Sequence, residues 1–165
     1  MELVTPGICL AAALYFEARG EPPIGQIAVG QVILTRVKDK RWPKTVCKVV
    51  KQGGEVRDRC HFSFYCDGKS DIPTDQKAWR RAKMLAELML TNHWYYDPTG
   101  GSNHYHNETV KPYWTTAFKL ETVIGNHLFY KDKPNANSSR PSSSDIYSTI
   151  ASSSRIEQKY EGQDE

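Results

Sequence analysis

Two carboxylates stand four residues apart in the segment Tyr15-Phe-Glu-Ala-Arg-Gly-Glu-Pro. Glu17 follows a run of apolar helix formers, and Glu21 comes just before a proline. Paired carboxyl groups are used to cleave glycosidic bonds, one as acid and the other as nucleophile or base. A separation of about 5 Å suits a retaining enzyme, and a wider one suits an inverting enzyme. Cleavage of a sugar chain is therefore the first hypothesis for this segment.

The surroundings expected for Glu17 would suit a general acid. It should lie in the last turn of a buried helix, where apolar neighbours and the negative helix end disfavour the ionised carboxylate, whereas contact with Arg19 would favour it. If desolvation prevails, the pKa of Glu17 rises and the proton is held near neutral pH. Without such burial, Glu17 would be an ordinary solvated carboxylate.

Glu21 is the obvious second carboxylate, but its position is not fixed by helix geometry. Residues four apart share a helix face, yet Gly20 and Pro22 place Glu21 at or beyond the helix end. A salt bridge with Arg19 or Arg36, serving the scaffold, is the favoured interpretation. The catalytic alternative for Glu21 stays open at this point.

The segment His104-Tyr-His has the alternation of a strand, which predicts His104 and His106 on one face and Tyr105 on the other. Lining of a substrate groove is the favoured role for the two histidines. Structural hydrogen bonding is the second possibility and zinc binding the least favoured, because the sequence contains no HExxH pair. Three further histidines are candidates to complete such a zinc site: His61, His93 and His127.

The remaining candidates are side chains of types that bind sugars. Gln26, near the start of a second predicted helix, could bind a sugar amide. The aromatic side chains expected to face sugar rings are Phe64, Tyr96, Tyr105 and Trp114. Each of these types is individually more often a core residue than a binding platform.

Capping signals and apolar spacing predict four helices. One runs from Thr5-Pro6 to about residue 19 and should be buried, because residues 8–16 are apolar nearly all round. The other three are expected from about residue 23 to the charged run 36–41, from Thr45 to Val50, and from Thr74-Asp75 to about Leu90.

Two short aromatic segments bounded by turn residues follow the last helix. Asn103-His-Tyr-His-Asn and Asn126-His-Leu-Phe-Tyr both have the composition of strands. Together with the helices they predict an α+β domain, mostly helical, with a small antiparallel sheet.

Composition predicts one globular domain, residues 1–131, followed by a disordered tail rich in serine and asparagine, residues 132–165. The net charge of +3 suits a polyanionic target. We expect no nucleic-acid partner, because no basic patch is interleaved with aromatic residues. We expect no membrane insertion either, because no apolar stretch reaches the roughly 18 residues that a span needs.

Four cysteines allow three complete pairings. Cys60 and Cys66 are close enough to staple a short loop, and Cys47 could reach either of them. Cys9 lies in the apolar helical run and is expected to be a core residue. Structural disulfides or free core thiols are favoured well over a metal site.

Several motifs occur in the order typical of the spore-cortex-lytic, SleB/CwlJ-type cell-wall hydrolases, and the chain resembles that family over about residues 8–130. The segments that carry the resemblance are Ala12-Ala-Leu-Tyr-Phe-Glu-Ala-Arg-Gly-Glu-Pro, Gly25-Gln-Ile-Ala-Val, Val32-Ile-Leu-Thr-Arg-Val, Trp42-Pro, Cys60-His-Phe-Ser-Phe-Tyr-Cys-Asp-Gly, Asp97-Pro-Thr-Gly-Gly, His104-Tyr-His and Ile124-Gly-Asn-His-Leu-Phe-Tyr.

The resemblance implies a domain like lysozyme or the lytic transglycosylases, with Glu17 as its single catalytic residue and no cofactor. The implied reaction breaks the β-1,4 bond between N-acetylmuramic acid and N-acetylglucosamine in peptidoglycan and leaves 1,6-anhydro ends. Three alternatives remain: a hydrolytic muramidase that uses Glu17 with Glu21 or Asp67, a zinc amidase, and a non-catalytic wall-binding or virion protein.

This sequence departs from the family pattern at His61, where a glutamine is expected before Phe-Ser. It also shows no recognisable wall-binding repeat or secretion signal. These features favour a monomeric phage or prophage lysis enzyme. Such an enzyme would be made in the bacterial cytoplasm and would reach the wall through a holin-like partner or as part of a virion.

Overall fold

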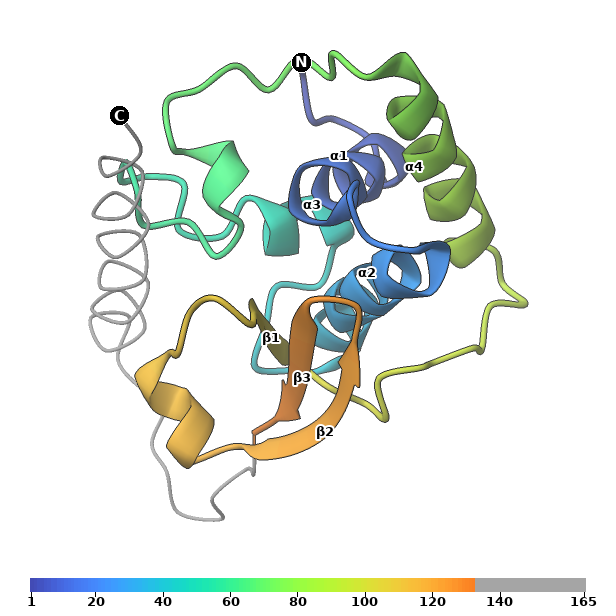
Figure 1. Ribbon diagram of the computed structural model, residues 1–165. Coiled ribbons are helices and arrows are strands. Elements are labelled where there is room, and N and C mark those ends of the chain that lie inside the picture. Colours follow the sequence, from blue (N-terminus) through green and yellow to red (C-terminus); the bar gives the residue numbers. More distant parts are fainter. Residues whose placement is uncertain (133–165) are drawn as a thin grey trace, which may run out of the picture.

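The computed structural model describes residues 1–132, which form a helical layer beside a small antiparallel sheet (Figure 1). The predicted α+β class is confirmed, and the predicted tail lies outside the described residues from 133 onward. In chain order the elements are α1 (Pro6–Ala18), α2 (Pro23–Lys38), α3 (Val46–Val50), the 3₁₀ turn η1 (Ser63–Tyr65), α4 (Gln76–Met89), β1 (His104–Asn107), the 3₁₀ turn η2 (Tyr113–Thr116), β2 (Lys119–Ile124) and β3 (His127–Lys131).

Helix α1 is the buried centre of the helical layer. It begins as predicted, because the Thr5 side chain accepts a hydrogen bond from the Ile8 amide and Pro6 occupies the first helical position. Residues 9–15 are all buried, which confirms the interpretation of the apolar run. α1 packs against α2, α3 and α4. In the described part of the chain, no helix is long and apolar enough to span a bilayer.

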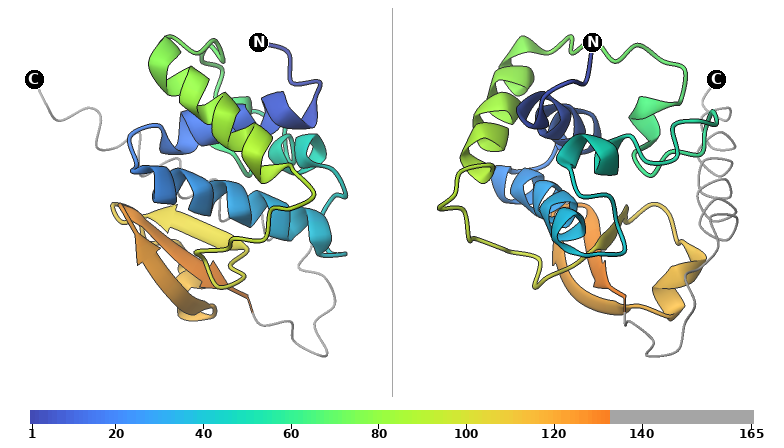
Figure 2. Two further views of the ribbon diagram at one scale, coloured as in Figure 1. Left: turned by 90° about the vertical axis from the view of Figure 1, so that its right-hand side faces the viewer. Right: turned by 180° about the vertical axis from the view of Figure 1, so that it is seen from behind.

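Helix α2 is the middle layer of the molecule, with α1 and α4 on one side and the sheet on the other (Figure 2). Its sheet-facing side buries Ala28, Val29 and Val32 against Phe129 of β3. Ile33, by contrast, packs in the larger hydrophobic cluster around α1, so α2 takes part in both hydrophobic clusters of the fold.

The sheet has the strand order β1-β3-β2, with both pairings antiparallel. The two predicted strands are confirmed, and β2 is a strand that we did not predict. The register pairs Tyr105 with Phe129 and His106 with Leu128. Because side chains alternate along a strand, Tyr105 and Phe129 face α2 together, and the flanking residues of β1 face away.

Two disulfides form within the helical part of the described residues. Cys9–Cys47 joins α1 to α3, and Cys60–Cys66 closes the loop that contains η1. The predicted Cys60–Cys66 staple is therefore confirmed. The expectation that Cys9 is a core residue is confirmed, and its sulfur also forms a disulfide with Cys47, a pairing that we did not predict. Closing a 38-residue separation restricts the unfolded chain and so favours the fold.

Candidate active site

Glu17 lies in the last turn of α1 and is half-buried, between the fully buried Tyr15 and Ala18. Its Oε2 accepts a hydrogen bond of 3.1 Å from the Tyr105 hydroxyl, which reaches it from β1. Burial and the negative charge of Glu17 raise the pKa of Tyr105 well above 10. Tyr105 therefore stays protonated and donates to the carboxylate, holding Glu17 in one orientation.

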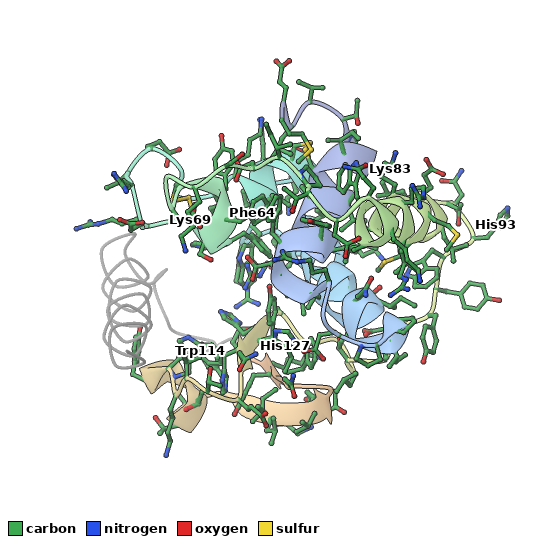
Figure 3. The ribbon with its side chains drawn as sticks, turned by 45° about the horizontal axis from the view of Figure 1, so that its top comes forward. Phe64, Lys69, Lys83, His93, Trp114 and His127 are labelled. Atoms are coloured by element: carbon green, nitrogen blue, oxygen red, sulfur yellow. A yellow bond between two sulfur atoms is a disulfide. The ribbon has the colours of Figure 1, made fainter. Side chains whose placement is uncertain are left out.

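The neighbour of Glu17 on α1, Phe16, is held by η1. Its ring stacks on Phe64 with centroids 4.9 Å apart. Phe64 is only 6% exposed, so it packs against α1 and does not offer a free ring face to a sugar. In Figure 3, Phe64 lies with the helical layer, and Trp114 lies across from it beside the sheet.

Glu21 is buried, with 8% of its surface exposed, and is held by the turn between β2 and β3. Its Oε2 accepts a hydrogen bond from the backbone N–H of Asn126 at 3.1 Å, and its Oε1 lies 3.6 Å from His127 Nδ1. The predicted scaffold role fits this geometry, but the predicted partners are wrong. Arg19 lies over the Tyr15 ring, and Arg36 donates to a backbone carbonyl.

The glycine at position 125 leaves room for the Glu21 side chain. Gly125 has a positive φ, in the left-handed region that favours glycine, and a Cβ at this position would overlap Glu21 Oε2. Gln26 completes the arrangement, because its Nε2 donates to the Glu21 carbonyl at 3.0 Å. Gln26 is 2% exposed, so the expectation that it binds a sugar amide gives way to a structural role in the turn after α1.

The predicted alternation along β1 is confirmed. His104 and His106 both pack on Trp114, with ring centroids 5.3 and 5.7 Å away, whereas Tyr105 points to α1. His106 is 9% exposed and its ring stacks on Tyr130 of the neighbouring strand β3, so it is a buried structural residue and does not line a groove. His104 and Trp114 are half-buried, as residues at the edge of a binding site would be.

A second group of polar side chains lies around Arg36 of α2. Burial, and then the Arg36 charge, lowers the pKa of His61 to about 3 and that of His104 well below 6.5, so both are neutral at neutral pH. The centroid of the Trp42 ring lies 5.7 Å from Arg36 Cζ and 5.9 Å from that of His104. From the sequence, Arg36 was expected only as a partner for Glu21, and Trp42 was not a candidate site residue. The motifs Trp42-Pro and Thr35-Arg-Val, which carry part of the family resemblance, were the signals that pointed to these two residues.

Other candidates lie apart from Glu17 or face elsewhere. Tyr96 is half exposed on the segment between α4 and β1, where its ring meets Trp94, which in turn donates to Gln31. His93 lies at the far end of α4, well away from His127 (Figure 3). Within residues 1–132, no three histidine, cysteine or acidic side chains are grouped to hold a metal ion.

Comparison with known proteins matches residues 20–130 to the family described as Cell Wall Hydrolase, a range that begins just after Glu17. Spore cortex-lytic enzymes are similar: that of Bacillus cereus is 34% identical over 74% of this chain and 42% of its own length, and that of Bacillus subtilis 31% identical over 73% and 35%. The chain thus spans less than half the length of these curated relatives.

Two solved structures share the fold. The catalytic domain of the Bacillus cereus SleB protein has a TM-score of 0.58 at 30% identity, with 79% of this chain and 93% of that one covered. The catalytic domain of the germination-specific lytic transglycosylase SleB from Bacillus anthracis has a TM-score of 0.59 at 32% identity, with 78% and 97% covered. The similarity therefore includes nearly all of each solved domain.

We expect Gly125→Ala to lower the free energy of unfolding by about 2 kcal/mol, because alanine is strained at a positive φ and its Cβ displaces the Glu21 carboxylate. Gly20→Ala is the matched control, because a Cβ there would meet no neighbouring atom. Its effect should stay within about 0.5 kcal/mol, as for other surface substitutions. Urea denaturation measures both. Equal stability of the two variants would contradict the packing assigned to Glu21.

Proposed function

This chain belongs to the Cell Wall Hydrolase family, and from that premise we propose that it cleaves the glycan strands of bacterial peptidoglycan. The bond cleaved is the β-1,4 linkage between N-acetylmuramic acid and N-acetylglucosamine, and the product carries a 1,6-anhydromuramic end. The observation that carries this proposal is the contrast between two carboxylates, because Glu17 is only half-buried whereas Glu21 is buried and bound to the β2–β3 turn.

One carboxyl group suffices for the proposed reaction because it acts twice. Glu17 first donates its proton to the glycosidic oxygen as the bond from C1 to that oxygen breaks, which releases the N-acetylglucosamine side as an alcohol. The resulting carboxylate then removes the proton from the muramoyl C6 hydroxyl as its oxygen bonds to C1. Glu17 ends the cycle protonated, and no water is consumed.

Tyr105 prepares Glu17 for both steps. Its hydroxyl donates a hydrogen bond to Oε2, which restrains the orientation of the carboxyl group. The same hydrogen bond stabilises the carboxylate formed after the first proton transfer, and hydrogen bonds to charged groups are among the stronger ones in proteins. Tyr105 is thus a positioning residue for Glu17.

A hydrolytic muramidase would need a second carboxylate near Glu17. Both oxygens of Glu21 face the β2–β3 turn, and Asp67 accepts the backbone N–H of Lys69 in the loop after the Cys60–Cys66 disulfide. This arrangement supports the single-carboxylate mechanism. The Bacillus anthracis relative, described as a lytic transglycosylase, supports it as well.

We also propose that the enzyme acts outside the reducing cytoplasm, as an endolysin or another cell-wall lytic enzyme. Two disulfides among the described residues favour an oxidising environment. Release through a partner-made opening in the membrane is one route that would bring it to the wall.

We expect Glu17→Gln to lower the rate of peptidoglycan solubilisation about 1000-fold, because the amide can neither donate nor accept the proton. Binding to insoluble wall should survive. Glu87→Gln, on the exposed side of α4, is the matched control and should keep full activity. Mass spectrometry of the wild-type digest should find anhydromuramic ends. Lysis by the Glu17→Gln protein, or reducing muramic ends in the digest, would refute the proposal.

Tyr105→Phe should lower kcat about 10-fold and leave KM nearly unchanged, because the phenylalanine ring keeps the packing on Phe129 and loses only the hydrogen bond to Glu17. Tyr95→Phe removes a hydroxyl from a ring that is 92% exposed and serves as control. Steady-state kinetics on soluble glycan strands measure both variants. If the two behave alike, Tyr105 does not position Glu17.

A further inference from the structure

Arg36 is a buried cation, and among the described residues only one nitrogen of its guanidinium donates a hydrogen bond to the protein. The residue is 7% exposed, and its Nε donates to the Asn103 carbonyl at 2.7 Å. The rings of Trp42 and Phe62 lie beside the guanidinium, each with its centroid 5.7 Å from Cζ. Within residues 1–132, the two terminal nitrogens of Arg36 donate to no protein acceptor, and neither is fully buried. They therefore retain access to solvent from an otherwise enclosed side chain.

No carboxylate of the described residues forms an ion pair with Arg36. Asp132 lies close enough to favour the charged form of Arg36, but its own oxygens bind the guanidinium of Arg41 at 2.6 Å and the side-chain amide of Asn103. Burial lowers the pKa of Arg36 to about 10, so it is still protonated at neutral pH. An enclosed positive charge with free donors and no paired anion is what an anion-binding site presents before its ligand arrives.

Arg36 and Glu17 both act on Tyr105. The Tyr105 hydroxyl donates to Glu17, and the Arg36 charge acts on the same phenol, where it opposes the rise in its pKa. Two neutral imidazoles, His61 and His104, flank Arg36 and add no competing negative charge. An anion bound at Arg36 would thus belong to the sugar at or next to the bond that Glu17 cleaves.

We propose that Arg36 is an anion-binding subsite that takes a carboxylate of the muramic side chain beside the scissile bond. The inference rests on the proposed function and narrows its substrate class. Of the two sugars in the glycan, only muramic acid carries a carboxyl group, on its lactyl substituent. That group is a free carboxylate in peptide-free strands, and in peptide-bearing strands it is an amide leading to the carboxylates of the stem peptide. The two free ends of a guanidinium match a carboxylate in paired, charge-assisted hydrogen bonds.

His104 adds a feature suited to the rest of that sugar. Its Nδ1 lies 2.8 Å from the Asn103 side-chain oxygen. That oxygen can only accept, so the proton is on Nδ1 and Nε2 is an acceptor. An acceptor beside Arg36 would bind a sugar hydroxyl or amide N–H and not a second anion. The Arg36 guanidinium and the His104 imidazole would then bind different groups of one muramic acid residue.

The test measures binding in the Glu17→Gln background, so that no substrate is consumed. Calorimetry compares peptide-free glycan oligosaccharides with the same oligosaccharides after every lactyl carboxylate is converted to a methylamide. It also compares peptide-bearing strands before and after their stem-peptide carboxylates are converted to methylamides. With Arg36 present, amidation of the peptide-free strand should weaken binding about 10- to 30-fold. Weakening seen only for the peptide-bearing pair would place the bound carboxylate on the stem peptide instead.

The variant arm adds Arg36→Met, with Arg80→Met on the exposed side of α4 as the control for net charge. Arg36→Met should bind native and amidated strands equally, and Arg80→Met should keep the difference. If Arg36→Met does not fold, the comparison of strands on the protein with Arg36 intact still decides. Equal binding of native and amidated strands by that protein overturns the subsite. Failure to bind any glycan strand would instead contradict the proposed function.

Discussion

The buried carboxylate of Glu21 joins the helical layer to the sheet, and the placement of the other site residues depends on that contact. It accepts the backbone N–H of Asn126 and lies beside His127, in space that glycine at position 125 leaves open. β3 leads directly from this turn and pairs with β1, which sets Tyr105 opposite Phe129 and under the end of α1. Glu21 therefore affects the chemistry indirectly, because it stabilises the part of the fold that places Tyr105 beside Glu17.

This arrangement separates the roles of two carboxylates that are four residues apart in sequence. Glu17 keeps access to solvent at the end of a buried helix and has a protonated phenol on one oxygen. The neutral His61 and His104 do not compete with it as acids at neutral pH, because burial and the Arg36 charge keep them deprotonated. The chemistry that fits is proton donation and proton removal by one group in turn.

Local signals in the sequence were enough to predict much of this fold. The Thr5 cap and the apolar run after it specify a buried helix, because both act within a few residues. Strand 119–124 was missed, since its apolar side chains stay half exposed at the sheet edge and give little alternation. Such local signals do not reveal contacts between residues that are distant in sequence. Nothing near Cys9 indicates Cys47, and nothing near Gln26 shows that its amide is used by a backbone carbonyl and not by a sugar.

In the proposed mechanism a single carboxylate drives an intramolecular ring closure, and water takes no part. Digestion of purified glycan strands in water enriched in ¹⁸O tests this directly, because transglycosylation forms the new bond from the sugar's own C6 oxygen whereas hydrolysis adds an oxygen from solvent. Mass spectrometry of the released fragments should find muramic ends without ¹⁸O, one water lighter than the hydrolytic product. Incorporation of one ¹⁸O atom at each new muramic end would contradict the account.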